Sequence, residues 1–396
     1  AHGLRVVIDV VYNDFGPAGN YLAAYSPHYF TRDVPTPRCE APNFRCAQLR
    51  RLVIGNARYW LETFGCDGLR LDAVHTIVDP SPRHVLRELV DTVRSVRPDA
   101  WLIAEDERNE PRLVREVGLD SIWADDFHHQ VHTLLTRETD GYYAAYTPRV
   151  DALAHTIERG WLYEGQPFVV SGEARGAPAD ELPATAFVYC TQNHDQVGNR
   201  AFGERLHQLV GVDAAGLGAA VMAFLPMPML LFMGQEWAAT TPFLYFTDHD
   251  AELGDKVRQG RRAEFARFAA FADPAVRERI PDPQAASTFT ASVLQWAERD
   301  HDPHRAVLTF HRQLLALRRD DPVLRATDRA GLTARADGER LVLTRRSAAG
   351  TRVLVANFGS APAALPAEAM GKLLFGALVD GQLPAKAVVV VDPEQT

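Results

Sequence analysis

The stretch that decides the fold is Gly68-Leu69-Arg70-Leu71-Asp72-Ala73-Val74, a short and largely apolar run that contains two charged side chains. Five further runs of the same kind lie at residues 6–11, 101–104, 121–124, 186–190 and 229–233. Most are apolar at consecutive positions rather than at alternate ones, which is typical of parallel strands covered on both faces. The sequence therefore predicts a sheet of six parallel strands.

Helical patterns separate these runs. Residues 49–64 and 82–96 repeat apolar side chains near the helical period, and Ser81 stands before Pro82 as a candidate N-terminal cap. Alternating strands and helices predict an α/β fold of the (β/α)8 TIM barrel type. Six strands are two short of a closed barrel, so we expect the missing N-terminal pair to lie upstream of Ala1.

The pattern changes after Pro322. Residues 306–318 form a last amphipathic helical pattern, and the β-rich runs 340–344, 351–356, 372–375 and 387–391 follow, divided by Gly, Pro and Asp. We therefore predict two domains. Residues 1–322 would form the barrel, incomplete at its N-terminus, and residues 323–396 a C-terminal antiparallel β domain.

Composition favours a neutral binding partner. The 396 residues carry 42 basic and 51 acidic side chains, a formal net charge of −9, which argues against a nucleic acid because phosphates require a basic surface. The longest apolar run, residues 219–233, is broken by two prolines and is too short to cross a membrane. Cys39 and Cys46 could form a disulfide bond in an oxidising compartment, but the four cysteines match no disulfide framework. We expect free thiols and a cytoplasmic protein.

Polar side chains follow nearly every predicted strand. In chain order they are Asp9 and Asn13, Arg70 and Asp72, Glu105 and Asp106, Asp125 and Asp126, Asn193 with His194 and Asp195, and Gln235 with Glu236. In a βα barrel the carboxyl ends of the strands face one shared cavity. Gathering so many carboxylates in one place is electrostatically unfavourable, because like charges repel. Such an arrangement is typical of sites whose chemistry needs the carboxylates, so we expect an active site there.

Asp72 and Glu105 are the best candidates for a catalytic pair. Retaining glycoside hydrolysis requires a nucleophilic carboxylate and a carboxylic acid about 5–5.5 Å apart, and neighbouring strands about 4.8 Å apart can supply that separation. Strand alternation puts Arg70 on the same side as Asp72, where the guanidinium can keep the carboxylate ionised and oriented. The alternative is a pair of structural salt bridges at strand ends.

Four segments in order resemble the signature regions of the α-amylase family of glycoside hydrolases. They are Asp9-Val10-Val11-Tyr12-Asn13, Gly68-Leu69-Arg70-Leu71-Asp72-Ala73-Val74-His75, Ile103-Ala104-Glu105 and Asn193-His194-Asp195. The resemblance implies that Asp72 is the nucleophile, Glu105 the acid/base and Asp195 a third carboxylate that binds sugar hydroxyls. It also implies that Arg70 and His194 contact the nucleophile and the sugar. In the family the first region normally ends Asn-His, whereas here Asp14 follows Asn13.

Further segments resemble the maltooligosyltrehalose trehalohydrolase family. They are Trp123-Ala124-Asp125-Asp126-Phe127-His128-His129, Gln192 to Arg200, Phe232-Met233-Gly234-Gln235-Glu236-Trp237 and Gly260 to Phe265. That resemblance implies hydrolysis of the α-1,4 bond beside a terminal trehalose unit, with an oligosaccharide as substrate. We include Asp9, Asn13, His75, Asp125, Asp126, Phe127, His128, Asn193, Gln235 and Glu236 as candidate sugar contacts.

Several alternatives remain open from the sequence. His128 and His132 have the spacing of metal ligands on a helix, but the Glu of a zinc-protease helix is missing, so we expect no metal and no cofactor. A structural role is as plausible as sugar contact for His75, Gln235 and Glu236. A glucan-branching enzyme, an α-amylase and an inactive glucan-binding protein are the competing functions. The oligomeric state is not predicted.

Overall fold

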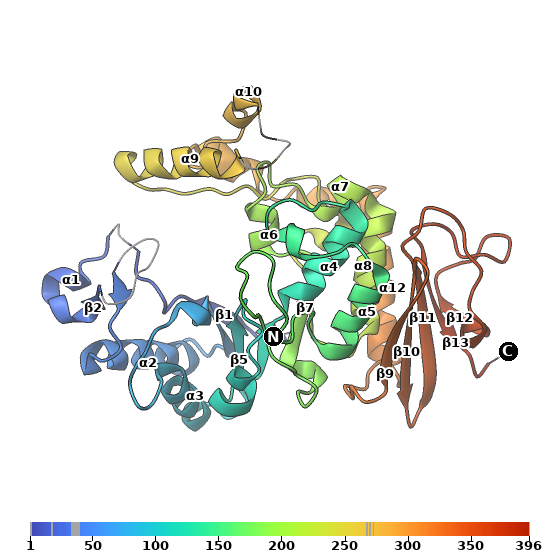
Figure 1. Cartoon of the computed structure of the whole chain (residues 1–396), viewed down its shortest axis with the longest axis horizontal. Coiled ribbons are helices and arrows are strands. Elements are labelled where there is room, and N and C mark those ends of the chain that lie inside the picture. The colour runs from blue at the N-terminus through green and yellow to red at the C-terminus, as the bar shows by residue number, and fades with distance from the viewer. Residues whose placement is uncertain are drawn as a thin grey trace. The chain divides into compact units, whose positions relative to one another are not determined.

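The computed structural model describes residues 2–16, 19–32, 40–266, 268, 271 and 273–395. The chain divides into two compact units. The first comprises residues 1–124 and 175–188, and the second comprises residues 125–174 and 189–396. Figure 1 labels many of the helices and strands of the two units, which are described separately below.

Parallel strands form the centre of the barrel portion. They are β1 (Val7–Val10), β4 (Gly68–Leu71), β5 (Trp101–Glu105), β6 (Ser121–Trp123), β7 (Phe187–Cys190) and β8 (Met229–Leu230). They pair in chain order, as in a (β/α) barrel that lacks two strands. Strand β7 is shared, because its first two residues pair with β6 in the first unit and its last two with β8 in the second. The prediction of six parallel strands is confirmed.

Close packing in the first unit requires a glycine at the start of β4. A Cβ atom on Gly68 would lie 2.4 Å from the carbonyl oxygen of Trp101 on the neighbouring strand. All four residues of β4 are buried, including Arg70, as expected for a parallel strand covered on both faces. The strand is shorter than predicted: it ends at Leu71, and residues 74–76 form a 3₁₀ turn.

Short and long helices accompany the strands of the first unit. They are α1 (Leu22–Tyr25), α2 (Ala47–Glu62) and α3 (Val85–Val96), and the short strands β2 (Phe30–Thr31) and β3 (Ala41–Pro42) pair with each other. Helix α2 buries Leu49, Val53, Ala57 and Leu61, one side chain per turn. The N-terminal cap of α3 is His84, whose Nδ1 accepts a hydrogen bond from Leu86 N, so the prediction of a Ser81 cap is wrong.

The helices of the second unit are α4 (Asp125–Thr136), α5 (Val150–Arg159), α6 (His194–Gly198), α7 (Leu206–Val210), α8 (Val212–Phe224), α9 (Ala251–Phe265), α10 (Pro274–Glu278), α11 (Ala286–Ala291) and α12 (His304–Asp320). Two arginines, the half-buried Arg318 and the buried Arg345, hold the last turn of α8 and the chain that leads from it to β8. Arg318 on α12 donates to the carbonyl oxygens of Met222, Ala223, Leu225 and Met227, and Arg345 donates to Phe224 O. Burial lowers the pKa of both guanidinium groups.

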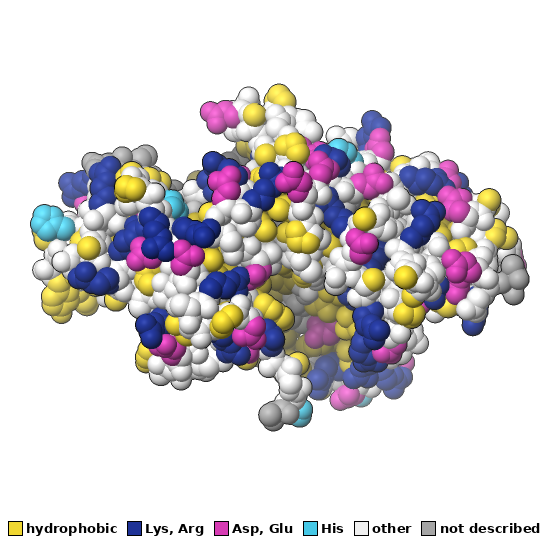
Figure 2. All heavy atoms as spheres, turned by 90° about the horizontal axis from the view of Figure 1, so that it is seen from below, with side chains coloured by type: hydrophobic (Ala, Val, Ile, Leu, Met, Phe, Trp, Pro, Cys, Tyr) yellow, Lys and Arg dark blue, Asp and Glu magenta, His cyan; other side chains and the backbone are white. Residues whose placement is uncertain are grey.

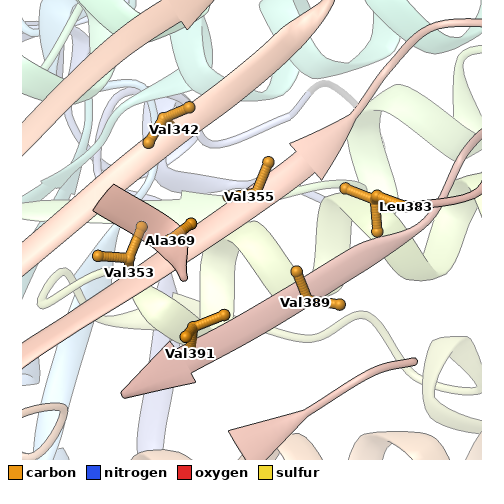
Figure 3. Close-up of a cluster of buried hydrophobic side chains, with 7 residues drawn as sticks. All are labelled: Val342, Val353, Val355, Ala369, Leu383, Val389 and Val391. Atoms are coloured by element: carbon orange, nitrogen blue, oxygen red, sulfur yellow. The ribbon is translucent and has the colours of Figure 1, made fainter. Parts of the chain in front are cut away.

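The C-terminal part of the second unit is an antiparallel sheet, as predicted. Its strands are β9 (Leu332–Asp337), β10 (Arg340–Ser347), β11 (Gly350–Asn357), β12 (Lys372–Phe375) and β13 (Val388–Asp392), in the order β12-β13-β11-β10-β9. Figure 3 shows its core on these strands and the neighbouring loops, with Val342, Val353, Val355, Ala369, Leu383, Val389 and Val391 buried together. Strand β9 was not predicted. The domain boundary at Pro322 stays a prediction.

The charged side chains on the surface and the state of the cysteines are described next. On the face in Figure 2, basic and acidic side chains are interspersed with apolar ones, in keeping with a net charge of only −9. Cys46, Cys66 and Cys190 are free thiols, whereas Cys39 lies outside the described residues. A search of the described part of the chain finds no helix with the length and apolarity needed to cross a membrane.

Candidate active site

Arg70 on β4 is the centre of a charged cluster in the first unit. Its Nη1 lies 2.8 Å from Asp9 Oδ1 and 2.7 Å from Asp72 Oδ1, and its Nη2 lies 2.8 Å from Glu105 Oε2. The guanidinium also lies over the ring of Trp123, 4.1 Å from the ring centroid. Burial acts against the positive charge of Arg70, but attraction to Glu105 and the two aspartates raises its pKa above the usual value. One cation therefore holds three carboxylates.

Asp72 and Glu105 share this one guanidinium. Asp72 directly follows β4, and Glu105 is the last residue of β5, the strand that pairs with β4. Both carboxyl groups remain partly exposed, with 29% of the Asp72 side chain and 21% of the Glu105 side chain accessible. The Arg70 side chain itself is only 4% exposed. The cluster therefore combines a buried cation with two partly exposed carboxyl groups.

The backbone after Asp72 makes a sharp turn that also contacts Glu105. Ala73 adopts the left-handed conformation, with φ of 38°, which is unfavourable for a residue with a Cβ atom. This turn directs the amide of Ala73 at Glu105, and Ala73 N donates to Glu105 Oε2 over 2.9 Å. Backbone strain of this kind persists only where surrounding contacts enforce it, and it occurs often at functional sites.

Other candidates in the first unit lie close to this cluster in sequence but have different surroundings. Asn13 is half-buried after β1, and Asp14 Oδ1 accepts a hydrogen bond from Gly16 N, so Asp14 stabilises the loop. His75 lies in the 3₁₀ turn after β4, with its Nε2 3.8 Å from Glu107 Oε1. Asp106 is buried and paired with Arg108 rather than facing solvent.

Asp195 belongs to the second unit, in the short helix α6. Asn193 caps this helix, because its Oδ1 accepts hydrogen bonds from Asp195 N at 2.8 Å and Gln196 N at 3.3 Å. His194 Nε2 lies 3.6 Å from Asp195 Oδ2, and both side chains are exposed by more than 40%. Asn193 is buried, so its amide shapes the turn, while His194 and Asp195 project from it.

The structure does not support sugar contact by Asp126, Phe127 or His128. Asp126 is fully buried and accepts hydrogen bonds from Tyr146 Oη, Leu162 N and Tyr163 N. The ring of Phe127 is fully buried and stacks on Tyr189, with centroids 4.3 Å apart.

His128 is buried as well, and its ring stacks on His132. Burial, with the neighbouring histidines, lowers the pKa of His128 well below its usual value, so this imidazole is neutral near pH 7. These three corrections have one cause, because β6 ends at Trp123 and helix α4 begins at Asp125. Asp125, the first residue of α4, is half-buried.

Gln235 is also used inside the fold. It is buried, its Nε2 donates to Thr191 Oγ1 over 2.9 Å, and its Oε1 accepts from Phe232 N over 3.2 Å. These bonds fix the turn after β8, which supports the structural alternative for Gln235. Glu236 follows in the same turn, is half-buried, and lies near enough to Arg205 to affect its pKa.

One ion-pair network was not found by sequence reasoning. Glu138, two residues after α4, accepts two hydrogen bonds from the guanidinium of Arg200 and lies 2.7 Å from His132 Nε2. His132 is six residues from Glu138, but Arg200 is 62 residues away, and no local sequence pattern connects Glu138 with it. Within the described residues, no group of three or more His, Cys, Asp or Glu side chains is placed to hold a metal ion.

Known proteins with similar sequences bear trehalohydrolase names. The chain is 49% identical over 359 residues to the malto-oligosyltrehalose trehalohydrolase of Deinococcus radiodurans, over 90% of this chain and 59% of that protein. It is 42% identical to the enzyme of that name from Arthrobacter ramosus, over 82% of this chain and 57% of that protein. The chain therefore spans less than two thirds of the length of these relatives.

A solved structure has the same fold over nearly the whole chain. The crystal structure of a candidate α-amylase from Salmonella typhimurium superposes with a TM-score of 0.90 and 36% identity, over 98% of this chain and 68% of that chain. Residues 329–390 match a family model described as a domain of unknown function (DUF3459). The chain therefore belongs to the α-amylase family of glycoside hydrolases, and the curated relatives that it matches over most of its length are malto-oligosyltrehalose trehalohydrolases.

Proposed function

We propose that this chain carries the catalytic residues of a retaining hydrolase that cleaves the α-1,4 bond beside the terminal trehalose of maltooligosyltrehalose and releases trehalose. The observation that supports this most directly is that Asp72 and Glu105 lie at the ends of the neighbouring strands β4 and β5 and contact the same guanidinium, that of Arg70. The names of the relatives supply the substrate class. A neutral oligosaccharide also suits the modest charge of the chain.

The proposed mechanism is a double displacement. Glu105 donates a proton to the departing glycosidic oxygen while a carboxylate oxygen of Asp72 attacks the anomeric carbon, forming a covalent glycosyl ester. Glu105, now a carboxylate, then removes a proton from water, and the water oxygen displaces Asp72 from the anomeric carbon. The anomeric carbon is inverted twice, so its configuration is retained.

The charge balance around Arg70 fits the need for one ionised and one protonated carboxyl group. Asp9, Asp72 and Glu105 surround a single cation, which leaves an excess of negative charge if all three are ionised. Like charges held close together favour uptake of a proton by one of them. Arg70 orients Asp72 through a charge-assisted hydrogen bond of 2.7 Å.

Further residue roles come from the family resemblance. We propose that Asp195 binds sugar hydroxyls and favours the distorted sugar of the transition state, and that His194 contacts the sugar. Their exposure of more than 40% agrees with contact to a ligand. Asp125, His75 and Glu236 stay candidates for sugar contact because each is only half-buried. We keep the prediction of a cytoplasmic protein, which the three free thiols support.

Product analysis tests the proposal. The purified protein is incubated in parallel with maltotriosyltrehalose and maltopentaose, and the sugars are separated by chromatography. We expect trehalose and maltotriose from the first substrate, with the maltotriose released as the α anomer in early NMR spectra. Comparable cleavage of maltopentaose would indicate an α-amylase, and new α-1,6 linkages would indicate a branching enzyme.

A matched variant separates catalysis from binding. Asp72→Asn removes the nucleophile while keeping its shape, so it should abolish turnover and still bind the oligosaccharide. A wild-type protein that binds α-glucans without cleaving any of them would contradict the proposal and indicate a glucan-binding protein.

A further inference from the structure

The turn that carries Asp195 is fixed at its beginning by a side chain of its own. Helix α6 spans only His194–Gly198, too few residues to be stable alone. The buried Asn193 amide caps its first turn, and Asn199 N donates to Asp195 O over 2.8 Å at its end. Contacts beyond the helix must therefore hold its C-terminal side.

Two arginines supply those contacts. Arg261 on α9 is buried and donates from Nη2 to Gly198 O at 3.0 Å and to Arg200 O at 2.8 Å. Arg200, five residues after Asp195, extends its guanidinium in the other direction. Its Nη1 and Nη2 lie 2.8 and 2.9 Å from the two carboxylate oxygens of Glu138. The turn is thereby connected to both α9 and the segment after α4.

Glu138 can hold Arg200 in place because its carboxylate stays ionised. Burial opposes its charge, but hydrogen bonds from His132 and Arg200 lower its pKa to about 2, so the carboxylate is ionised at any pH at which enzymes of this class act. His132 lies on α4, which is buried over almost its whole length. A two-point guanidinium–carboxylate pair fixes direction as well as distance, which a single point charge does not.

We propose that Glu138 and Arg200 are positioning residues, which set the orientation of Asp195 for catalysis through the backbone of residues 195–200. The inference rests on the proposed function, because it assigns Asp195 a role in the transition state. Neither residue contacts substrate. Loss of the pair tilts the turn, and the misplaced Asp195 binds the distorted sugar less well while ground-state binding changes little.

The test compares two glutamates of the same kind. Glu138→Gln is expected to lower kcat for maltotriosyltrehalose about 10- to 100-fold and to change KM by less than about threefold. The matched control is Glu164→Gln. Glu164 also accepts hydrogen bonds from an arginine, Arg159 at 2.9 and 3.1 Å, and lies 3.4 Å from a histidine, His155, but both partners belong to α5. The control should leave kcat and KM unchanged.

Each outcome decides the inference. Thermal unfolding of both variants is measured first, and kinetics are run where the variants are folded. If Glu138→Gln matches Glu164→Gln in kcat, or if its loss lies in KM alone, the inference is wrong. If Glu138→Gln does not fold, Arg200→Lys, which keeps the charge but loses the two-point geometry, takes its place under the same criteria.

The outcomes also separate this inference from the proposed function. Active wild type with an unaffected Glu138→Gln overturns the inference alone. Wild type without any α-glucan turnover, or an Asp195→Asn variant with full activity, overturns the proposed roles and the inference with them.

Discussion

Replacing Arg70 by lysine tests the charged cluster at its centre. The guanidinium contacts three carboxylates from two of its nitrogens and lies over the ring of Trp123. Lysine keeps the charge but presents one compact ammonium group, which cannot reproduce that fork. Arg70→Lys should therefore keep the net charge of the cluster and lose the orientation of Asp72.

The magnitude follows from the contact with Asp72. A hydrogen bond to a charged group contributes about 1.5–3 kcal/mol, and partial exposure of the Asp72 side chain, 29%, argues against the upper limit. Loss of about 2 kcal/mol in the transition state corresponds to a fall in kcat of roughly 30-fold. The contact with Asp9 adds little, because 49% of that side chain is exposed.

The assay is trehalose release at saturating maltotriosyltrehalose, with the folded fraction checked by circular dichroism. Arg97→Lys is the matched control, since Arg97 pairs with Asp67 and donates to Cys66 O at the opposite end of β4. It should lower stability slightly and leave kcat unchanged. If Arg70→Lys keeps more than about a third of the wild-type kcat, Arg70 does not orient the nucleophile as described.

Three further predictions concern stability. Asp126→Asn replaces a buried acceptor of three hydrogen bonds and should lower the free energy of unfolding by about 2–3 kcal/mol in urea titrations. The kcat of the folded protein should be unchanged. A selective loss of kcat would instead indicate that Asp126 contacts the sugar. Burial, with nearby Arg205, lowers the pKa of His207 from 6.5 to about 4, so the unfolded chain takes up a proton at a higher pH than the folded protein does. The stability that this group contributes is complete above pH 6.5, and about 3 kcal/mol of the free energy of unfolding is lost by pH 4. This loss should be missing in His207→Asn. Ala73→Gly removes the Cβ atom of a residue in the left-handed conformation and should raise the free energy of unfolding by up to about 1 kcal/mol in urea titrations. The kcat should stay within twofold of the wild-type value, because the backbone amide remains. A large fall in kcat would show that the methyl group is needed for activity.

The sequence was most informative where strands end in charged residues. The positions of Arg70, Asp72 and Glu105 followed from strand alternation and from the shared carboxyl edge of a parallel sheet. Their common contact follows from the same regularity, since β4 and β5 are neighbours in register. Periodicity also located α2, α3 and α12 to within a few residues, although the cap at His84 was missed because histidine rarely caps helices.

The sequence was misleading where a strand passes directly into a buried helix. After Trp123 each residue rotates by about 100° instead of alternating, so Asp126 and His128 turn into the protein rather than toward a shared cavity. Helix α4 has almost no exposed side, which removes the amphipathic signal. The pairing of Glu138 with Arg200 depends on residues 62 positions apart, and no local pattern reports such a contact.

Side-chain mutagenesis does not test the contact between the amide of Ala73 and Glu105. The hydrogen bond to Glu105 comes from the main chain, so it survives every side-chain replacement that preserves the turn. A saturation scan would report position 73 as tolerant of several small residues and would assign it no importance. Only an ester in place of that peptide bond, introduced by amide-to-ester exchange, removes the donor and reveals what it contributes.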